Sequence, residues 1–467
     1  MLAFFNLLLF AFIVYYVIIF SLPFGKLKGV YMLLTVCIAG TTTLAMITSI
    51  LIKPYVSIGK HKIGLYWVVC LIGAIIMLST GCISLSSAID GITADTSVNP
   101  LKILTLFLSM TLLSVYLGDA GFFDYVADSV FLKTKGGALK LFLILYLAVS
   151  VLTIFTSNDV IILTFTPPIC IFAARAKISP LPFLLGEFVA ANTWSMTLII
   201  GNPTNVYLAS SYGIGFFEYL SVMWLPALTG SLTGLLMIFL LFRKHLLAPL
   251  PARKDGKNQN KKLIPHKTPL YGALAHLITC IILLSISDFI GLPMWSICFV
   301  LALSLTAFDL VYDIITEHTA LPVWRSIKKE PYELIPFVLS MFVIVLALNE
   351  CGFTQLLRNA ILTGNKSDGV TVGLLSAGVA NLLNNIPMSV LFESIIAGNG
   401  ISALYGAVIG SNVGAFITPV GALAGIMWNK ILSQYGVKLS FLKFVLYGTT
   451  VAIPTLLVSV FSLMLVL

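Results

Sequence analysis

Apolar residues dominate this chain in long runs that short polar stretches interrupt. Many runs hold about 20 residues, enough for an α-helix to cross a hydrocarbon layer of about 30 Å. A water-soluble fold of this length could not bury so much apolar surface, so the pattern predicts an all-α polytopic membrane protein. The runs lie at 4–23, 28–52, 64–88, 101–118, 139–156, 159–174, 183–200, 217–242, 269–287, 292–312, 334–349, 370–383, 386–397, 401–417 and 441–467.

Two of these runs, 159–174 and 386–397, look too short to span because Asn, Asp and Pro interrupt them. In "SNDVIILTFTPP" the apolar pattern stops at Pro167 and Pro168. Backbone groups freed by a broken helix must face protein or a water-filled cavity. We therefore expect two re-entrant hairpins, whose tip residues are Asn158, Asp159, Asn384 and Asn385.

One long polar stretch, at residues 243–269, divides the chain. It is rich in Lys, Asn, Gly and Pro, as flexible linkers are, and eight of the 27 basic residues lie between Arg243 and Lys267. Basic loops usually mark the cytoplasmic side of a membrane protein. We predict an extra N-terminal transmembrane span at 1–24, a first transmembrane repeat at 25–245, a basic cytoplasmic linker at 246–268 and a second transmembrane repeat at 269–467.

The two halves resemble each other in four blocks that keep the same order. These blocks pair 106–126 with 336–357, 157–160 with 384–387, 190–202 with 410–422, and 211–216 with 434–439. An internal duplication with paired broken segments is typical of secondary transporters, where the binding site lies at the repeat interface. The expected fold therefore has two inverted structural repeats with broken helices and two re-entrant hairpins.

The third block pair supplies helix breakers beside neutral polar groups. "IIGNPTNVYL" (199–208) and "GSNVGAFITPVGALAGIMW" (410–428) combine Gly and Pro, which unwind helices, with Asn and Thr, which offer donors and acceptors. Unwound carbonyls can coordinate Na⁺, and the N-termini of half-helices can hold an anion. Proline kinks with helix-packing glycines are the alternative interpretation of each motif taken alone.

Acidic residues within apolar runs need a physical reason. A charged side chain at mid-bilayer costs about 3 kcal/mol or more, so Asp159 should face a polar cavity, where it could bind a coupling ion. Glu187 could serve as a proton relay or as a hydrogen-bonded packing residue, and Glu393 is similar. Asp119 and Glu350 occupy matching run ends, where helix capping is the alternative to a functional role.

Other classes of protein find little support. The chain has no metal-ligand spacing, G-x-S-x-G or Walker motif, which argues against an enzyme and against primary pumping by this chain. The net charge of +9 is assigned to membrane orientation rather than to nucleic-acid binding. A non-transporting membrane sensor and a lipid-modifying membrane enzyme remain the alternatives from other classes.

The motifs "DAGFFDYVA", "NDVIILTFTP", "NNIP" and "VIGSNVGAFITPVGALA" carry a resemblance. From about residue 64 to 467 the chain resembles bacterial arsenite/antimonite efflux permeases, within the ion transporter superfamily that includes sodium–proton antiporters and dicarboxylate or citrate carriers. The resemblance implies a scaffold and a core that cycle by alternating access. The chain departs from the permeases at Asn412, where they carry a second acid, at Ala415, where they have Pro, and at Ala422, where they have Ser.

Residue pattern and resemblance together predict a secondary active transporter in a bacterial cytoplasmic membrane. It would move a small anion or oxyanion such as arsenite or antimonite, coupled to H⁺ or Na⁺; a Na⁺/H⁺ antiporter and a Na⁺-coupled dicarboxylate or citrate carrier are the alternatives. Membrane lipid and a small ion are the expected partners, with a homodimer and a soluble ATPase partner left open. No cofactor is expected, apart from Na⁺ as a coupling ion.

The predicted site residues fall into three sets. The substrate-binding set is Asn158, Asn202, Thr204, Asn205, Asn384, Asn385, Asn412, Thr418 and Gly421. The coupling-ion set is Asp159 and Glu187, and a Na⁺ would bind among Asn158, Asp159, Asn202, Asn385 and Asn412. No Lys or Arg lies at the centre of a core segment, so neutral groups would hold an anion; a neutral or cationic substrate fits equally well on charge.

Overall fold

The computed structural model describes residues 27–53, 55–58, 61–95, 99–133, 137–249, 267–398 and 400–467. The predicted span at 1–24 and most of the predicted linker at 246–268 lie outside the described residues. Before the linker the chain forms α2 (Leu27–Ile52), β1 (Tyr55–Ile58), β2 (His61–Gly64), α3 (Leu65–Ser79), α4 (Leu85–Thr93), α5 (Pro100–Asp119), α6 (Phe122–Lys133), α7 (Ala138–Phe155), α8 (Asn158–Ala176), α9 (Leu181–Trp194), the 3₁₀ turn η2 (Ile199–Gly201), α10 (Pro203–Ser211) and α11 (Phe216–Leu246).

The second half repeats this helical order. It forms α12 (Lys267–Ser285), α13 (Ser287–Ile290), α14 (Met294–Glu317), α15 (Leu321–Ile327), α16 (Leu334–Glu350), α17 (Phe353–Ile361), α18 (Asp368–Leu383), α19 (Asn385–Ile396), α20 (Ile401–Gly414), α21 (Leu423–Gln434) and α22 (Phe441–Val466). Among the described helices, eight are long and apolar enough to cross a membrane. The prediction of a polytopic helical membrane protein is confirmed.

The repeat is visible in the order and lengths of the helices. In each half a long helix leads into a short one (α5 and α6, α16 and α17), and α16 and α17 meet at a 76° bend. A helical hairpin follows (α7 and α8, α18 and α19), then a broken helix (α9 and α10, α20 and α21) and a long closing helix (α11, α22). The paired broken segments thus occupy equivalent places in the two repeats.

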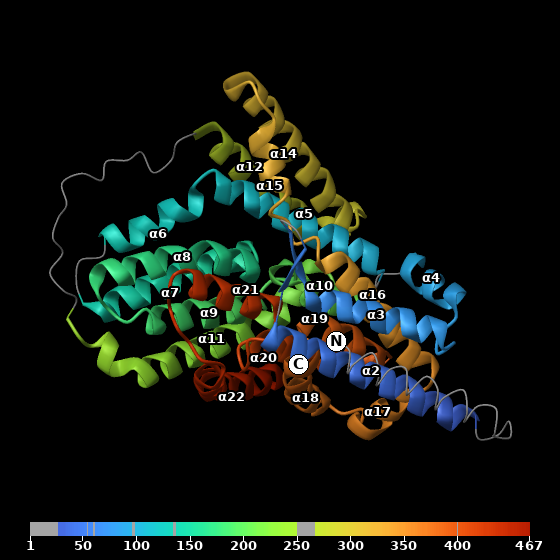
Figure 1. Cartoon of the computed structure of the whole chain (residues 1–467). Helices are drawn as coiled ribbons and strands as arrows, with labels where there is room; N and C mark the ends of the chain where they lie inside the picture. The colour runs from blue at the N-terminus through green and yellow to red at the C-terminus, as the bar shows by residue number, and fades with distance from the viewer. Residues whose placement is uncertain are drawn as a thin grey trace.

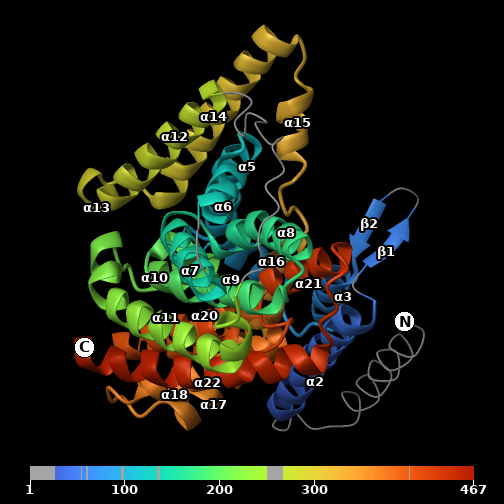
Figure 2. The same cartoon turned by 90° about the vertical axis from the view of Figure 1, so that its left-hand side faces the viewer.

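The two halves are interwoven rather than set side by side. The long helix α5 of the first half packs against α12 and α14 of the second, whereas α16 of the second packs against α2 and α3 of the first. These two groups lie in different parts of the molecule, with α12 and α14 at the top of both views, and α11 and α22 run side by side in its lower part (Figures 1 and 2). We call α2–α5 and α12–α16 the scaffold, and α7–α11 with α18–α22 the core.

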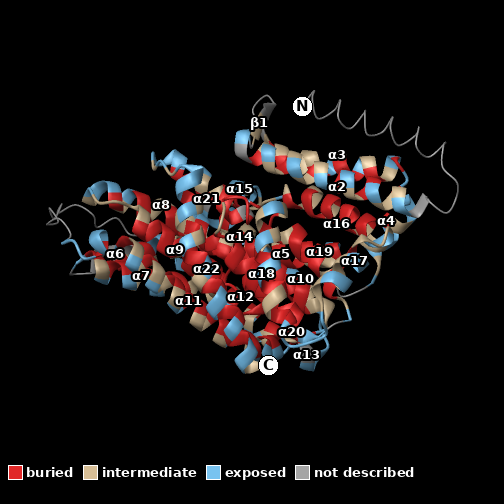
Figure 3. Cartoon of the chain, turned by 90° about the horizontal axis from the view of Figure 1, so that it is seen from below, coloured by how far each residue is buried: buried red, intermediate tan, exposed pale blue. Residues whose placement is uncertain are grey.

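Burial is deepest inside the core, as Figure 3 shows. Every residue from Pro182 to Thr193 of α9 is buried, and so is every residue from Ser402 to Gly414 of α20. A helix that is apolar on all sides must be enclosed by other helices. These two half-length helices therefore carry Asn192 and Asn412 into the interior at their C-terminal ends.

One local prediction was wrong, and one pair of elements was not predicted. The run at 159–174 is not a half-span, because α8 is 19 residues long and continues through Pro167 and Pro168. Proline is tolerated in such helices when neighbouring groups satisfy the carbonyls that it frees, so the break lies earlier, before the helix begins at Asn158. The chain between α2 and α3 was not predicted to form strands, yet β1 and β2 pair there as an antiparallel hairpin.

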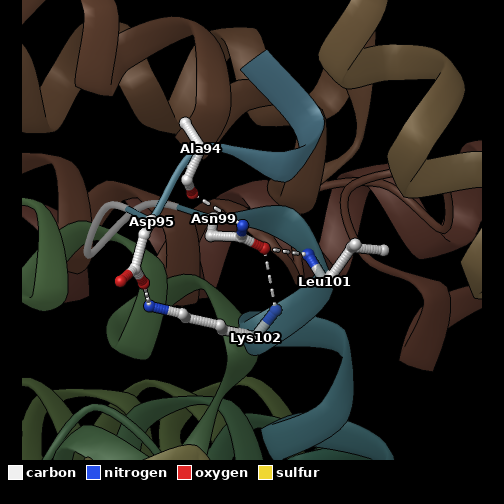
Figure 4. A network of polar contacts seen from close by, with 5 residues as sticks. All are labelled: Ala94, Asp95, Asn99, Leu101 and Lys102. Atoms are coloured by element: carbon white, nitrogen blue, oxygen red, sulfur yellow. Dashed lines mark hydrogen bonds and ion pairs between the residues drawn. The ribbon is translucent and has the colours of Figure 1, made fainter. Parts of the chain in front are cut away.

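The start of α5 is fixed by the polar network of Figure 4. The Asn99 side-chain oxygen accepts hydrogen bonds from the backbone N–H groups of Leu101 (2.8 Å) and Lys102 (3.1 Å), and its amide donates to the Ala94 carbonyl (2.7 Å). Such an N-cap contributes about 1 kcal/mol. Lys102 also pairs with the exposed Asp95 and lowers the pKa of that carboxyl. The network ties the end of α4 to the start of α5.

Candidate functional site

The points where helices are interrupted in the two repeats, which we call the breaks, meet inside the core. The hairpin helices α8 and α19 both begin there, and each packs against a half-helix of the other repeat, α8 against α21 and α19 against α10. The segments between α9 and α10 and between α20 and α21, residues 195–202 and 415–422, are not α-helical. Helix N-termini carry partial positive charge, so the arrangement surrounds one region with several favourable ends for an anion.

Asn412 is the centre of the first polar cluster. Its side-chain oxygen accepts hydrogen bonds from the Ser195 hydroxyl and the Asn202 amide, both at 2.9 Å. Its amide donates to the Asn205 side-chain oxygen at 2.7 Å and to the Val408 carbonyl at 2.8 Å. The amide group is fully buried with its bonding capacity filled. Asparagine at this position therefore joins the broken helix α9–α10 to α20.

The same cluster reaches the first hairpin. The Asn158 amide donates to the Asn192 side-chain oxygen at 3.2 Å, and the Ser195 hydroxyl also donates to the Asn192 carbonyl at 2.9 Å. On the other side, the Ser411 hydroxyl donates to the Thr204 hydroxyl at 2.7 Å. We call this group the amide cluster; its members are Asn158, Asn192, Ser195, Asn202, Thr204, Asn205, Ser411 and Asn412.

A second group clamps the unwound segment of the second repeat. The Asn384 amide donates to the Val420 carbonyl at 3.0 Å, and the Asn385 N–H donates to the Gly421 carbonyl at 3.0 Å. The Asn381 amide donates to the Gly414 carbonyl at 2.9 Å, and its oxygen accepts from the Thr418 N–H at 2.9 Å. We call this group the hairpin clamp; its members are Asn381, Asn384, Asn385, Gly414, Thr418, Val420 and Gly421.

The structure thus gathers the nine predicted substrate-binding residues into two groups that meet at the end of α20. Asn412 belongs to one group and Gly414, two residues later, to the other. Gly421 is needed for this closeness, because a Cβ there would lie 2.8 Å from the Gly414 carbonyl oxygen. Within the described residues, no lysine or arginine bonds to either group, so any anion here would be held by neutral donors.

The two predicted coupling residues have different surroundings. Asp159 lies half-buried in the first turn of α8, and among the described residues its carboxylate has neither a hydrogen bond nor an ion pair. Glu187 is fully buried, and the Thr166 hydroxyl donates to both of its oxygens, at 2.9 and 3.1 Å. Glu187 lies about 7.5 Å of helix rise before Asn192, so it links α8 to α9 rather than joining the amide cluster.

The predicted Na⁺ ligands differ in availability. The side-chain oxygens of Asn158, Asn202 and Asn412 already accept hydrogen bonds from neighbouring groups. The side-chain oxygens of Asp159 and Asn385 accept none from the described residues. Of the five predicted ligands, these two side chains are therefore the ones whose oxygens are not used by hydrogen bonds from the described residues.

The other acidic residues lie away from the breaks. The Ser326 hydroxyl of α15 donates to Asp119 at 2.6 Å, and Lys329 pairs with the same carboxylate, so Asp119 joins the end of α5 to the end of α15 and the residues that follow it. Glu350 is exposed at the end of α16. Glu393 lies near the end of α19 and lines a separate cavity.

The predicted site set missed six members of these groups. Gly414 and Val420 contribute only backbone carbonyls, and the four that contribute side chains are Asn192, Ser195, Asn381 and Ser411. The repeat alignment paired Asn192 with Asn412, which was enough to suggest it. Asn381 lies three and four residues before Asn384 and Asn385, a spacing that places polar side chains near one another at the end of a helix. Ser195 and Ser411 carry no such signal, because serine is common and only the folded chain reveals their partners.

Asn384 offers a test of the hairpin tip. It adopts φ +78°, ψ 155°, a conformation that favours glycine, and its amide holds the Val420 carbonyl. We expect Asn384→Gly to lose the amide contact but relieve the backbone, and Asn384→Ala to lose the contact and keep the strain. Thermal unfolding in detergent should therefore rank alanine below glycine by about 1 kcal/mol. Equal stability of the two variants would contradict this reading of the tip.

Comparisons with known proteins agree with this architecture. The model of the citrate transporter family matches residues 55–403. The arsenical pump membrane protein of Escherichia coli (strain K12) is 26% identical over 372 residues, covering 76% of this chain and 84% of that protein.

Two solved structures share the fold. The Neisseria gonorrhoeae MtrF structure, described as illuminating a class of antimetabolite efflux pumps, is 12% identical with a TM-score of 0.51 and 95% of each chain covered. The Alcanivorax borkumensis YdaH transporter is 13% identical with a TM-score of 0.50, covering 93% of this chain and 98% of that one. At these identities the likeness concerns the fold alone. The chain therefore belongs to the citrate transporter family and is an integral membrane transporter of the bacterial inner membrane, not an enzyme.

Proposed function

We propose that this transporter moves a small oxyanion or oxyacid of the arsenite/antimonite class by secondary active transport, coupled to H⁺ or Na⁺. The observation that carries the proposal is the meeting of helix N-termini and neutral amides at the breaks, with no lysine or arginine bonded there among the described residues. Arsenite in neutral water is chiefly uncharged As(OH)₃. Its hydroxyls suit amide and carbonyl partners, and they need no cationic side chain.

The proposed coupling group is Asp159. It lies next to Asn158 of the amide cluster, and within the described residues no partner neutralises its carboxylate. A proton or Na⁺ bound there would remove an uncompensated charge from a protein interior. Binding of the coupling ion would in this way lower the cost of moving the hairpin across the membrane centre.

The proposed cycle is a movement of the core against the scaffold. The core carries both polar groups, whereas α5 and α16 of the scaffold contact it along α8, α10 and α19. Alternating access in transporters of inverted-repeat design proceeds by such largely rigid movements around a fixed site. In a homodimer, contacts between the two scaffolds would keep the scaffold fixed during this movement. A soluble ATPase partner is a further proposal, and the reconstituted protein described below can test it.

The deciding experiment is uptake into proteoliposomes. Purified protein would be reconstituted into vesicles, and arsenite would be added outside them under an imposed pH gradient, an imposed Na⁺ gradient or neither. Arsenite flux that follows one gradient supports the proposal and identifies the coupling ion. Flux of citrate or succinate in place of arsenite would instead assign an organic-anion carrier, and Na⁺ flux driven by H⁺ alone would assign an antiporter.

Asn412 provides a variant with a defined expectation. Asn412→Asp introduces the acid that the arsenite permeases carry, but it removes the donor to the Asn205 oxygen at 2.7 Å and to the Val408 carbonyl at 2.8 Å. Leaving buried acceptors unpaired costs about 1–3 kcal/mol each. We expect slower transport, reduced about tenfold or more, and a lower melting temperature. Transport equal to that of the parent chain would show that the amide cluster does not need this donor.

A further inference from the structure

A cavity of about 210 Å³ lies between the scaffold and the core, apart from both polar groups. Its walls come from α4, α10, α16 and α19. On α16 the residues Phe342, Val345, Leu346 and Asn349 follow one face of the helix at spacings of three, four and seven. Glu393 and Ser394 face them from the end of α19, and Tyr207 closes the side formed by α10.

The walls are held in place by specific contacts. A Cβ on Gly91 would lie 2.5 Å from Leu346 Cδ1, so α4 approaches α16 closely only because this residue is glycine. The Arg358 guanidinium donates from Nε to the Ile395 carbonyl at 2.8 Å and from Nη2 to the Ser394 carbonyl at 2.9 Å. The end of α19 that bears Glu393 is therefore fixed to α17.

The cavity has a polar end and an apolar end. Asn349, Glu393 and Ser394 lie one to two turns further along α16 and α19 than Phe342 and Val390, which line the apolar end. The Thr354 hydroxyl donates to the Asn349 oxygen at 2.7 Å, which leaves the Asn349 amide group to face a ligand.

The charge at the polar end is negative. Among the described residues no cation forms an ion pair with Glu393, and its one hydrogen bond, from the Ser394 hydroxyl, is long at 3.5 Å. Arg358 acts on this carboxylate through its charge, but its Nε and Nη2 donors are engaged by the two carbonyls. A partly buried carboxylate without an ion-pair partner favours a positively charged ligand.

Size and wall chemistry narrow the ligand class. A volume of about 210 Å³ is far more than a bare metal ion fills. The apolar walls and the aromatic rings of Tyr207 and Phe342 suit an organic cation, since ammonium groups are attracted to aromatic faces and alkyl groups to apolar walls. We propose that this cavity binds a small organic ammonium ion, with its charged group at Glu393 and its alkyl part along α16.

Such a ligand would bridge two parts that must move. Phe342 and Asn349 belong to the scaffold, whereas Glu393 belongs to a core hairpin. An occupied cavity would oppose the sliding of α19 past α16, so the cation should inhibit transport; this consequence alone rests on the proposed function. The binding itself does not depend on which substrate is moved.

The test is a binding measurement on the purified full chain with n-butylammonium as the probe. Melting temperature would be followed against the concentration of n-butylammonium, of its neutral counterpart n-butanol and of the anion butyrate. We expect n-butylammonium alone to stabilise the protein. In Glu393→Gln its affinity, taken from the concentration dependence of the melting temperature, should fall about tenfold or more. Glu350→Gln is the matched control, because Glu350 is exposed on α16 beside Asn349 but does not line the cavity.

A second variant covers the case in which Glu393→Gln does not fold. Val345→Phe fills the apolar end and leaves the carboxylate in place, so it should also abolish stabilisation by n-butylammonium. Equal binding of n-butanol, or unchanged binding in both cavity variants, would overturn the proposal. If n-butylammonium binds but does not slow arsenite flux, the cavity site stands and the proposed transport cycle fails, so the two failures are distinguishable.

Discussion

Replacement of Asp159 by asparagine is expected to abolish gradient-driven transport while leaving the protein folded. The exchange keeps the shape of the side chain and removes its ability to bind a proton or to pair with Na⁺ by charge. No hydrogen bond or ion pair to this carboxylate is lost within the described residues. The helix N-terminus of α8 loses an interaction with a negative charge worth about 0.3–1 kcal/mol, and the interior loses an unpaired charge, so the net change in stability is small.

The measurement is substrate flux in proteoliposomes with and without the driving gradient, alongside the melting temperature of each preparation. Glu218→Gln is the matched control, because Glu218 also lies in the first turn of a helix, α11, but is exposed and belongs to neither polar group. We expect the control to transport normally. Full gradient-driven transport by Asp159→Asn would remove Asp159 from the coupling mechanism and move attention to Glu187.

The breaks of both repeats could be predicted because polar residues have few physical reasons to interrupt an apolar run. Asn158, Asn384 and Asn412 each lie in such an interruption, and the repeat alignment relates the interruptions of one half to those of the other. This reasoning located the polar groups without a structure. It also placed Thr418 and Gly421, whose roles depend on the unwound backbone rather than on side-chain chemistry.

Packing between the halves could not be predicted in the same way. The apolar runs of α2, α3, α12 and α14 are similar in composition, so their sequences do not indicate that α5 packs on helices of the other half. The continuation of α8 through Pro167 and Pro168 likewise depends on neighbours that only the fold provides. Hydrogen-bond partners such as Ser195 and Asn381 follow from that packing, which is why they were missed.

The contact between α18 and α20 leads to the second large prediction. Gly406, Gly410 and Gly414 recur every four residues on α20 and face small residues of α18. A Cβ on Gly410 would lie 2.0 Å from the Ser376 hydroxyl oxygen and 2.4 Å from the Gly373 carbonyl oxygen. Small residues at such spacing allow two helix backbones to approach closely inside a membrane.

We expect Gly410→Val to destabilise the protein by about 3 kcal/mol or more, because the backbone carbonyl of Gly373 cannot move without displacing α18. The same displacement would carry Asn412 away from Asn202 and Asn205, so transport should be lost together with stability. The melting temperature in detergent and flux in proteoliposomes measure the two effects.

Gly378→Val on α18 is the matched control for this prediction. Gly378 is exposed, and a Cβ there would meet nothing within 4 Å, so the same change of residue adds a side chain without touching α20. Valine is also a better helix former than glycine, by a few tenths of a kcal/mol. We expect the control to fold and transport like the parent chain. A Gly410→Val protein as stable as this control would mean that α18 and α20 tolerate separation, and that the amide cluster does not depend on their close contact.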